Sequence, residues 1–149
     1  MKPSKLPNLL GSYSMLNVTR TSNSTAPNQW GNAPTGLLVY NPNGYISVNM
    51  AATESEYRPM TISWPPNSTQ PHEDWVIAAH HAMSYAGHFT IEEDNGDTGV
   101  VHHGPITVAS VPSMMGTTML RDYELIRTEE VVYLALVGTG STIWWTKID

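Results

Sequence analysis

Short apolar runs separated by turn residues fill most of this chain, and the clearest example is LLVYNPNGYISVNM at residues 37–50. Two runs rich in β-branched and aromatic residues flank Asn-Pro-Asn-Gly, which is typical of a β-hairpin. The same order of run, turn and run recurs around residues 94–97 and 126–130. Consecutive strands joined by such short turns pair side by side, so the pattern restricts the chain to antiparallel sheets.

Further strands are predicted at residues 9–20 and 142–148, which brings the expected total to about eight. Residues 73–83, EDWVIAAHHAM, are the helix candidate because their apolar residues recur at helical spacing. Residues 51–72 contain four prolines and predict a long, partly ordered segment. Strands and helices do not alternate, and a meander must hide its sheet edges. We therefore expect an all-β closed barrel with one short helix, in a single domain over residues 1–149.

The charge balance of the chain excludes several classes of partner. The formal net charge is -6 and the seven Lys and Arg are scattered, so we expect no nucleic acid and no anionic membrane surface as partner. No run approaches the roughly 18 apolar residues of a membrane span, and the first residues lack the pattern of a signal peptide. The absence of cysteine excludes disulfides and thiolate zinc sites. These features predict a cytoplasmic protein.

Several segments, taken in order, resemble the short lipocalin-like domain family of bacteria and fungi. LLGSYSML resembles its opening Leu-Leu-Gly-Thr-Trp pattern, and PTGLLVYNPNGYISVNM resembles its Gly-x-Leu-x-Tyr-x-Pro-x-Gly-Tyr hairpin. The later strands of the family, including a Thr-His-His strand, resemble SYAGHFTI, VVHHGPI, GTTMLRDYEL and IWWTKI. Two features depart from the pattern: Tyr13 stands where the family usually has Trp, and residues 51–72 are longer and richer in Pro.

The resemblance implies an eight-stranded barrel with an internal ligand cavity, and it implies no single reaction. Some fungal relatives are small proteins of secondary-metabolite pathways, which indicates a small hydrophobic molecule as the partner. Small barrels often pair, so a homodimer stays open as an alternative.

Two histidine doublets, His80–His81 and His102–His103, stand out in a chain without cysteine. Adjacent residues of a strand point to opposite faces, so His102 and His103 cannot bind one metal ion from one regular strand. The first doublet lies on the predicted helix with its side chains about 100° apart, which suits chelation poorly. We expect no metal site. Because the sequence also has no Gly-rich phosphate loop, Rossmann pattern or catalytic thiol, we expect no cofactor.

The strand pairing predicts which histidine of the second doublet faces inward. With a turn at Asp94–Asp97, Phe89 lies opposite His102, and Tyr85 shares their face. This face is the more apolar one, so His102 is predicted inside the barrel and His103 outside, although a one-residue change in the turn would reverse them. An inward imidazole can move protons without a cofactor. The alternative is a histidine that packs and makes one hydrogen bond.

Other polar side chains are predicted on inward faces. Arg121 and Tyr123 share one face of their strand, with the alternative that Arg121 pairs with an acid at the barrel end. Pairing of Tyr40 with Tyr45 gathers the polar side chains of the hairpin on one face, and the family pattern favours that face over the Ile/Val face as the interior. The residues expected to bind substrate are Tyr40, Ser47, Asn49, Tyr85, Phe89 and Trp145.

These predictions describe a cofactor-independent isomerase, cyclase or dehydratase that acts on an apolar polyketide- or terpenoid-type intermediate by acid–base catalysis. His102 is the predicted acid or base, and Arg121 and Tyr123 are predicted to stabilise developing charge. Two alternatives stay open. A carrier of small hydrophobic ligands needs the same pocket but no proton-transfer group, and a small hydrolase, for instance one that opens an epoxide, needs a carboxylate or a polar group that holds water.

Overall fold

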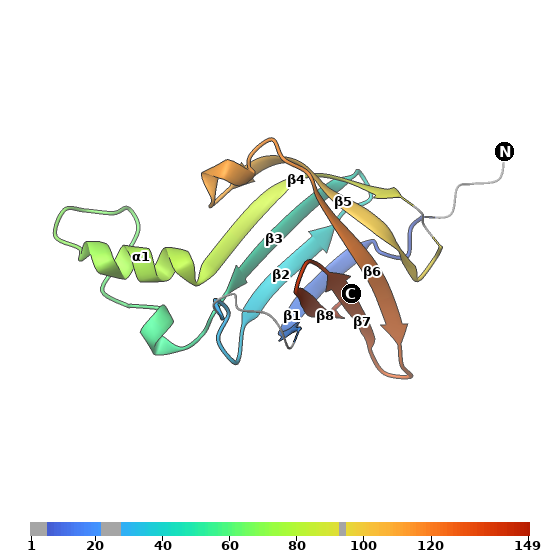
Figure 1. Ribbon diagram of the computed structural model, residues 1–149, viewed down its shortest axis with the longest axis horizontal. Helices are drawn as coiled ribbons and strands as arrows, with labels where there is room; N and C mark the ends of the chain where they lie inside the picture. Colours follow the sequence, from blue (N-terminus) through green and yellow to red (C-terminus); the bar gives the residue numbers. More distant parts are fainter. Residues whose placement is uncertain (1–5, 22–27, 93–94) are drawn as a thin grey trace.

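Eight antiparallel strands close into a barrel in the computed structural model of the protein, which describes residues 6–21, 28–92 and 95–149 (Figure 1). The strands are β1 (Gly11–Arg20), β2 (Thr35–Tyr40), β3 (Tyr45–Ala51), β4 (Ala82–Glu92), β5 (Thr98–Ala109), β6 (Met119–Arg127), β7 (Val132–Val137) and β8 (Ser141–Lys147). Each strand pairs with the next one along the chain, and β8 pairs with β1. The predicted all-β barrel of eight strands is confirmed.

The segment that precedes β1 caps one end of the barrel. Leu9 and Tyr13 are both fully buried, and the Tyr13 hydroxyl donates to the carbonyl oxygen of Leu9 at 2.7 Å. Lys147 donates from Nζ to the carbonyl oxygen of Leu10 at 2.6 Å, and its ammonium lies 5.4 Å from the centre of the Tyr13 ring. Tyr13 therefore ties this capped end together by a hydrogen bond and a cation–π contact.

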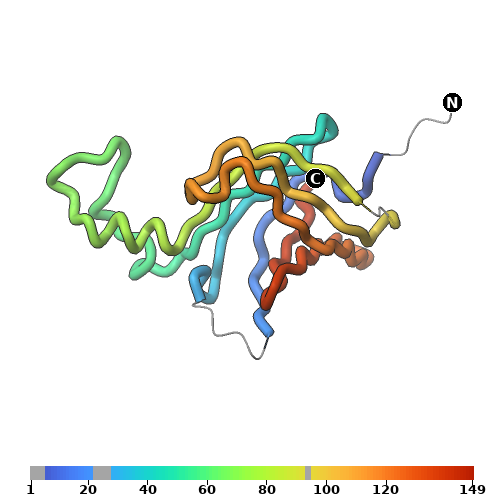
Figure 2. Tube along the Cα trace, turned by 45° about the horizontal axis from the view of Figure 1, so that its top comes forward, coloured from blue at the N-terminus to red at the C-terminus, as the bar shows by residue number. Residues whose placement is uncertain are grey.

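The longest connection joins β3 to β4 at the opposite end of the barrel. It contains the 3₁₀ turn η1 (Ser55–Tyr57) and the helix α1 (His72–His80), which projects beyond the barrel in both views (Figures 1 and 2). No residue of α1 is buried. The predicted helix is confirmed but ends earlier than residue 83, because the chain enters β4 at Ala82. In the part of the chain that the structure describes, no helix is both long and apolar enough to cross a membrane.

The β2–β3 hairpin pairs one residue away from the predicted register. Tyr40 lies opposite Ile46 instead of Tyr45. The backbone amide of Asn41 donates to the carbonyl oxygen of Tyr45 at 3.0 Å, which extends the ladder by one pair. The loop is thereby reduced to residues 42–44, and its last residue is a glycine with a φ of +87°.

This shift turns β3 over relative to the prediction, because successive side chains of a strand point to opposite faces. Ile46, Val48 and Met50 face the interior and are 2–4% exposed. Ser47 and Asn49 face outward, so the prediction that they line the interior is wrong. The Ile/Val face, which the sequence offered as the alternative, is the inner one.

A β-bulge in β5 overturns a second prediction of orientation. Phe89 pairs with His103, and Gly87 pairs with Ile106. The chain therefore advances three residues along β5 where it advances two along β4. The additional residue lies at Gly104–Pro105, where Gly104 has a φ of +151°. An additional residue in one strand of an antiparallel pair shifts its alternation by one position.

His103 is therefore the inward histidine of the doublet. Its exposed fraction is 1%, and its inward neighbours Val101 and Ile106 are 0% and 2% exposed. The prediction that His102 faces the interior is wrong, because it assumed unbroken alternation from Ile106 back to His102. The predicted turn at Asp94–Asp97 also placed Phe89 opposite His102, whereas Phe89 pairs with His103. Residues 93 and 94, at the start of this turn, lie outside the described residues.

Substituting Gly104 by Ala should destabilise the barrel by about 2 kcal/mol more than substituting Gly116 by Ala. Both glycines have a positive φ, +151° and +78°, so both variants carry backbone strain. A Cβ on Gly104 would lie 2.5 Å from Thr118 Oγ1 and 2.6 Å from the carbonyl oxygen of Thr117, whereas nothing lies within 4 Å of a Cβ on Gly116. Urea unfolding measures the difference, and equal losses would contradict the steric argument for Gly104.

Candidate functional site

His103 lies inside the barrel between two tyrosine hydroxyls. Tyr40 Oη is 2.6 Å from its Nε2, and Tyr85 Oη is 2.8 Å from its Nδ1. The three side chains come from β5, β2 and β4, and the exposed fractions of Tyr40, His103 and Tyr85 are 1%, 1% and 7%. Because both ring nitrogens are engaged, the orientation of the imidazole is fixed. We refer to these three residues as the Tyr–His–Tyr chain.

Burial controls the protonation of this chain. Desolvation, together with the positive charge of Arg121, lowers the pKa of His103 from 6.5 to about 3. Desolvation also raises the pKa of the Tyr40 and Tyr85 hydroxyls well above their usual value. At neutral pH the Tyr–His–Tyr chain is therefore uncharged, and His103 is a much weaker base than a histidine in water.

The two tyrosines lie towards different ends of the barrel. Tyr40 is paired with Gly11, the first residue of β1, and so belongs to the capped end. Its ring meets Tyr13 and Phe89 edge-on, with ring centres 6.2 and 5.0 Å apart. The Tyr40 ring thus packs among aromatic side chains, and the residue is 1% exposed.

Methionines gather at the opposite end, which we term the methionine end. These residues belong to the buried core or pack against it: Met15, Met50, Met83, Met114 and Met119. Methionine is flexible and polarisable, so such a wall adapts to apolar ligands of irregular shape. Tyr85 adjoins this end because it lies two residues from Met83 on β4, and Met83 pairs with Met50.

Trp145 brings an unpaired polar group into the same interior. The residue is 1% exposed, and its neighbours across the sheet are Met15 on β1 and Leu134 on β7. Its indole Nε1–H has no hydrogen-bond partner among the described residues. Leaving a buried donor without an acceptor is costly, so this group favours a ligand that supplies one.

Arg121 starts from the inward face of β6, as predicted, but its guanidinium lies at the rim. Nη1 donates to the carbonyl oxygen of Leu120 at 2.9 Å, and Nη2 lies 3.9 Å from Met119 Sδ. The influence of Arg121 on the Tyr–His–Tyr chain is electrostatic. Burial raises the pKa of Tyr85, and the positive charge of Arg121 partly opposes that rise.

Comparison with known proteins assigns this barrel to a family. The sequence matches the family model described as lipocalin-like domain over residues 10–148. The chain belongs to the lipocalin-like family. Searches of curated proteins and of solved structures found no match to it. A lipocalin-like barrel supports a role in binding or processing a small molecule, which agrees with the expected class of partner.

The lipocalin-like barrel places five of the nine predicted site residues in its interior: Tyr40, Tyr85, Phe89, Tyr123 and Trp145. Their roles in binding or catalysis stay predictions. His102 lies on the outer surface, where its Nε2 is 2.7 Å from Glu92 Oε2. His103 was predicted outside the barrel, with a one-residue change in the turn as the way to reverse it. A proline within a strand is a known sign of a bulge, and Pro105 lies two residues from His103.

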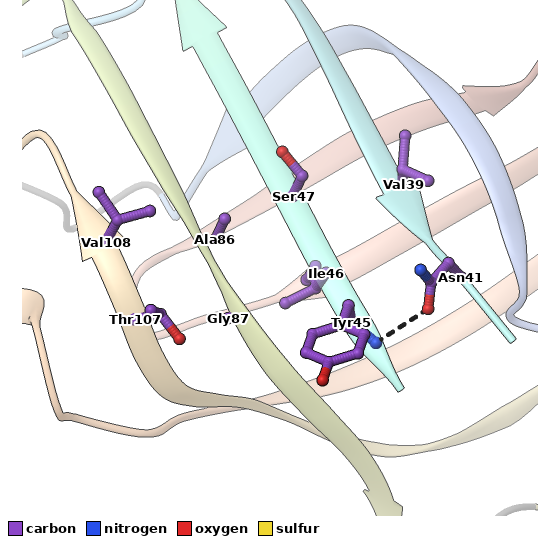
Figure 3. A pocket seen from close by; sticks show the side chains of 9 residues that line it. All are labelled: Val39, Asn41, Tyr45, Ile46, Ser47, Ala86, Gly87, Thr107 and Val108. Carbon is purple, nitrogen blue, oxygen red and sulfur yellow. Dashed lines mark hydrogen bonds between the residues drawn. The ribbon is translucent and has the colours of Figure 1, made fainter. Parts of the chain in front are cut away.

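Ser47 and Asn49 line hollows on the outer surface of the lipocalin-like barrel. One hollow of about 380 Å³ lies across β2 to β5 (Figure 3), and its lining residues are Val39, Asn41, Tyr45, Ile46, Ser47, Ala86, Gly87, Thr107 and Val108. Asn49 lines another, of about 260 Å³, together with Ser47 and Ser84. Tyr85 also lines the second hollow, and His103 lines neither. Within the described residues, no three His, Asp or Glu side chains converge as ligands for a metal ion.

Proposed function

We propose that this lipocalin-like protein is a cofactor-independent enzyme that isomerises, cyclises or dehydrates an apolar polyketide- or terpenoid-type intermediate. The observation that carries the proposal is the buried Tyr–His–Tyr chain, with hydrogen bonds of 2.6 and 2.8 Å on the two ring nitrogens of His103. In this proposal the substrate enters at the methionine end and binds beside Tyr85. Holding a flexible substrate in a reactive conformation lowers the entropic part of the barrier.

The Tyr–His–Tyr chain supports acid–base chemistry, but with a role for its histidine that differs from the role predicted for His102. With its pKa lowered to about 3, His103 is a neutral bridge between two hydroxyls and not the acting base. Hydrogen bonds in series polarise one another, so the chain can stabilise negative charge that develops on a substrate oxygen. The low dielectric of the interior strengthens that stabilisation.

The two alternatives receive different support. A carrier of hydrophobic ligands needs the apolar interior but has no use for the buried chain, and it would bind ligand without turnover. A hydrolase needs a carboxylate or a polar group that holds water inside the barrel. Apart from aromatic residues, the buried polar residues in the described ranges are Gln70 and His103, and neither is an acid.

The apolar, enolisable ketone 2-tetralone tests the proposal. In deuterium oxide the wild-type protein should accelerate exchange of the protons next to the carbonyl group. A solvent base takes one of these protons, the Tyr–His–Tyr chain stabilises the enolate that is left, and a solvent deuteron then adds to the same carbon. The His103→Gln variant should lose about 100-fold of that acceleration. Proton NMR measures the exchange rate, and His102→Gln, which alters the adjacent outward histidine, should exchange as fast as the wild type.

Each outcome distinguishes between the proposed activities. If wild-type protein binds 2-tetralone without accelerating exchange, the carrier alternative is favoured. If His103→Gln exchanges as fast as the wild type, the role assigned to His103 is wrong. Loss of exchange in His102→Gln as well would assign the effect to general disruption of β5.

A further inference from the structure

The hydrogen bonds around His103 leave one proton without an acceptor. Tyr40 and Tyr85 each carry one hydroxyl proton, and a neutral imidazole carries one N–H, so three protons are present for two hydrogen bonds. The imidazole donates from one nitrogen and accepts at the other. One tyrosine therefore donates to the ring, while the other accepts from the ring and keeps its own proton for a different partner.

Tyr40 is the tyrosine that donates to the ring. Among the described residues, the hydrogen-bond partner of its hydroxyl is His103 Nε2, and Tyr40 is 1% exposed, so no bulk water reaches it. If Tyr40 accepted from Nε2 instead, its own proton would be buried without an acceptor, which is strongly unfavourable. Tyr40 therefore donates to Nε2, the imidazole proton is on Nδ1, and Nδ1–H donates to Tyr85 Oη.

We infer that the hydroxyl of Tyr85 donates its proton to the ligand, and that the ligand presents an acceptor oxygen of the carbonyl or enolate type beside the methionine end. The inference rests on the proposed function, since it names the substrate class of that same interior site. Tyr85 is suited to this contact because it is the more exposed of the two tyrosines, at 7% against 1% for Tyr40. The Nδ1–H bond to its oxygen makes the Tyr85 hydroxyl a stronger donor.

A second unpaired donor points to the same ligand chemistry. The indole Nε1–H of Trp145 is buried inside the barrel and has no acceptor among the described residues. With Tyr85, it gives the described interior two donors that the protein does not satisfy, and no buried carboxylate is present there to accept them. A carbonyl or enolate oxygen supplies acceptor lone pairs and brings no further donor, whereas a hydrocarbon leaves both donors unpaired.

Matched ligands with and without a carbonyl group test the inference. Wild-type protein should bind 2-tetralone at least about 10-fold more tightly than tetralin, the hydrocarbon of the same skeleton, because only the ketone accepts a hydrogen bond. Tyr85→Phe should reduce this preference several-fold, and the preference that is left should come from the Trp145 Nε1–H. Tyr45→Phe is the matched control, since Tyr45 is on the outer surface and 50% exposed. Infrared spectra of carbon-13-labelled 2-tetralone should show a lower carbonyl frequency on wild type than on Tyr85→Phe.

The tautomer of His103 provides a measurement that needs no ligand. Nitrogen-15 NMR of histidine-labelled protein should find Nδ1 protonated and Nε2 unprotonated. The opposite tautomer would overturn the inference, as would an equal preference for 2-tetralone in wild type and Tyr85→Phe. Either result leaves the proposed function intact if exchange of 2-tetralone still depends on His103. Conversely, a carbonyl preference that depends on Tyr85 without any accelerated exchange would support the inference and refute the enzyme.

Discussion

Lowering the pH from 7 to 4 should cost the wild-type barrel about 3 kcal/mol more of its free energy of unfolding than it costs the His103→Gln variant. In the folded protein, burial and then the charge of Arg121 lower the pKa of His103 from 6.5 to about 3. The unfolded chain binds a proton at this residue near pH 6.5, whereas the folded chain resists protonation until about pH 3. The free energy of unfolding therefore falls as the pH drops from 6.5 to about 3. Below that pH, protonation of His103 no longer changes it.

Glutamine is the informative replacement because its amide keeps one acceptor and one donor for the two tyrosines and does not titrate. Carboxylates titrate in both proteins and cancel when the two urea unfolding curves are subtracted at each pH. His102→Gln serves as the control for replacing a histidine of β5 by glutamine on the outer surface, since His102 lies there beside Glu92. Parallel curves for wild type and His103→Gln would show that His103 is not held neutral by burial.

The architecture could be predicted from the sequence because it depends on local signals that agree with one another. Short β-rich runs, turn residues and the lack of helical crossovers each indicated an antiparallel meander, and closure follows from the need to protect the edges. The face of β6 was also predicted correctly, since no irregularity interrupts its pairing with β5 or β7. Long-range information was not needed for either result.

The site was harder to predict because it depends on the register, where an error of one residue exchanges the two faces of a strand. In β3 the error arose at Asn41, which joins the ladder instead of the loop. In β5 it arose at Gly104–Pro105, where the bulge shifts the alternation between His103 and Ile106. The residue types of the site were recognised, but His102 was predicted in the place that His103 occupies.

Arg121 illustrates a different limit of sequence reasoning. Its backbone position on the inner face was correct, yet the length of its side chain lets the guanidinium reach Leu120 and Met119 at the rim. Alternation along a strand fixes where a Cβ points and leaves the end of a long side chain undetermined. The charge still acts on His103 through the low dielectric of the interior, so Arg121 influences the site without a direct hydrogen bond to it.

Replacing Trp145 by Ala should destabilise the barrel by about 4 kcal/mol, whereas replacing Trp144 by Ala should cost about 1 kcal/mol. The two residues are adjacent in β8 and identical in type, so the comparison isolates the face of the sheet. Trp145 is 1% exposed and fills the interior between Met15 and Leu134. Trp144 is only partly buried on the outer face, where its Nε1 donates to Thr19 Oγ1 at 2.9 Å.

Trp145→Phe separates packing from hydrogen bonding at the same position. Phenylalanine keeps most of the apolar volume and removes the unpaired Nε1–H, so the loss from the smaller ring should be partly offset and the variant should lie well above Trp145→Ala in stability. Urea unfolding without ligand measures these differences. Equal destabilisation by Trp144→Ala and Trp145→Ala would mean that β8 does not alternate as described, and the unpaired indole N–H could then no longer be assigned to the interior that holds the Tyr–His–Tyr chain.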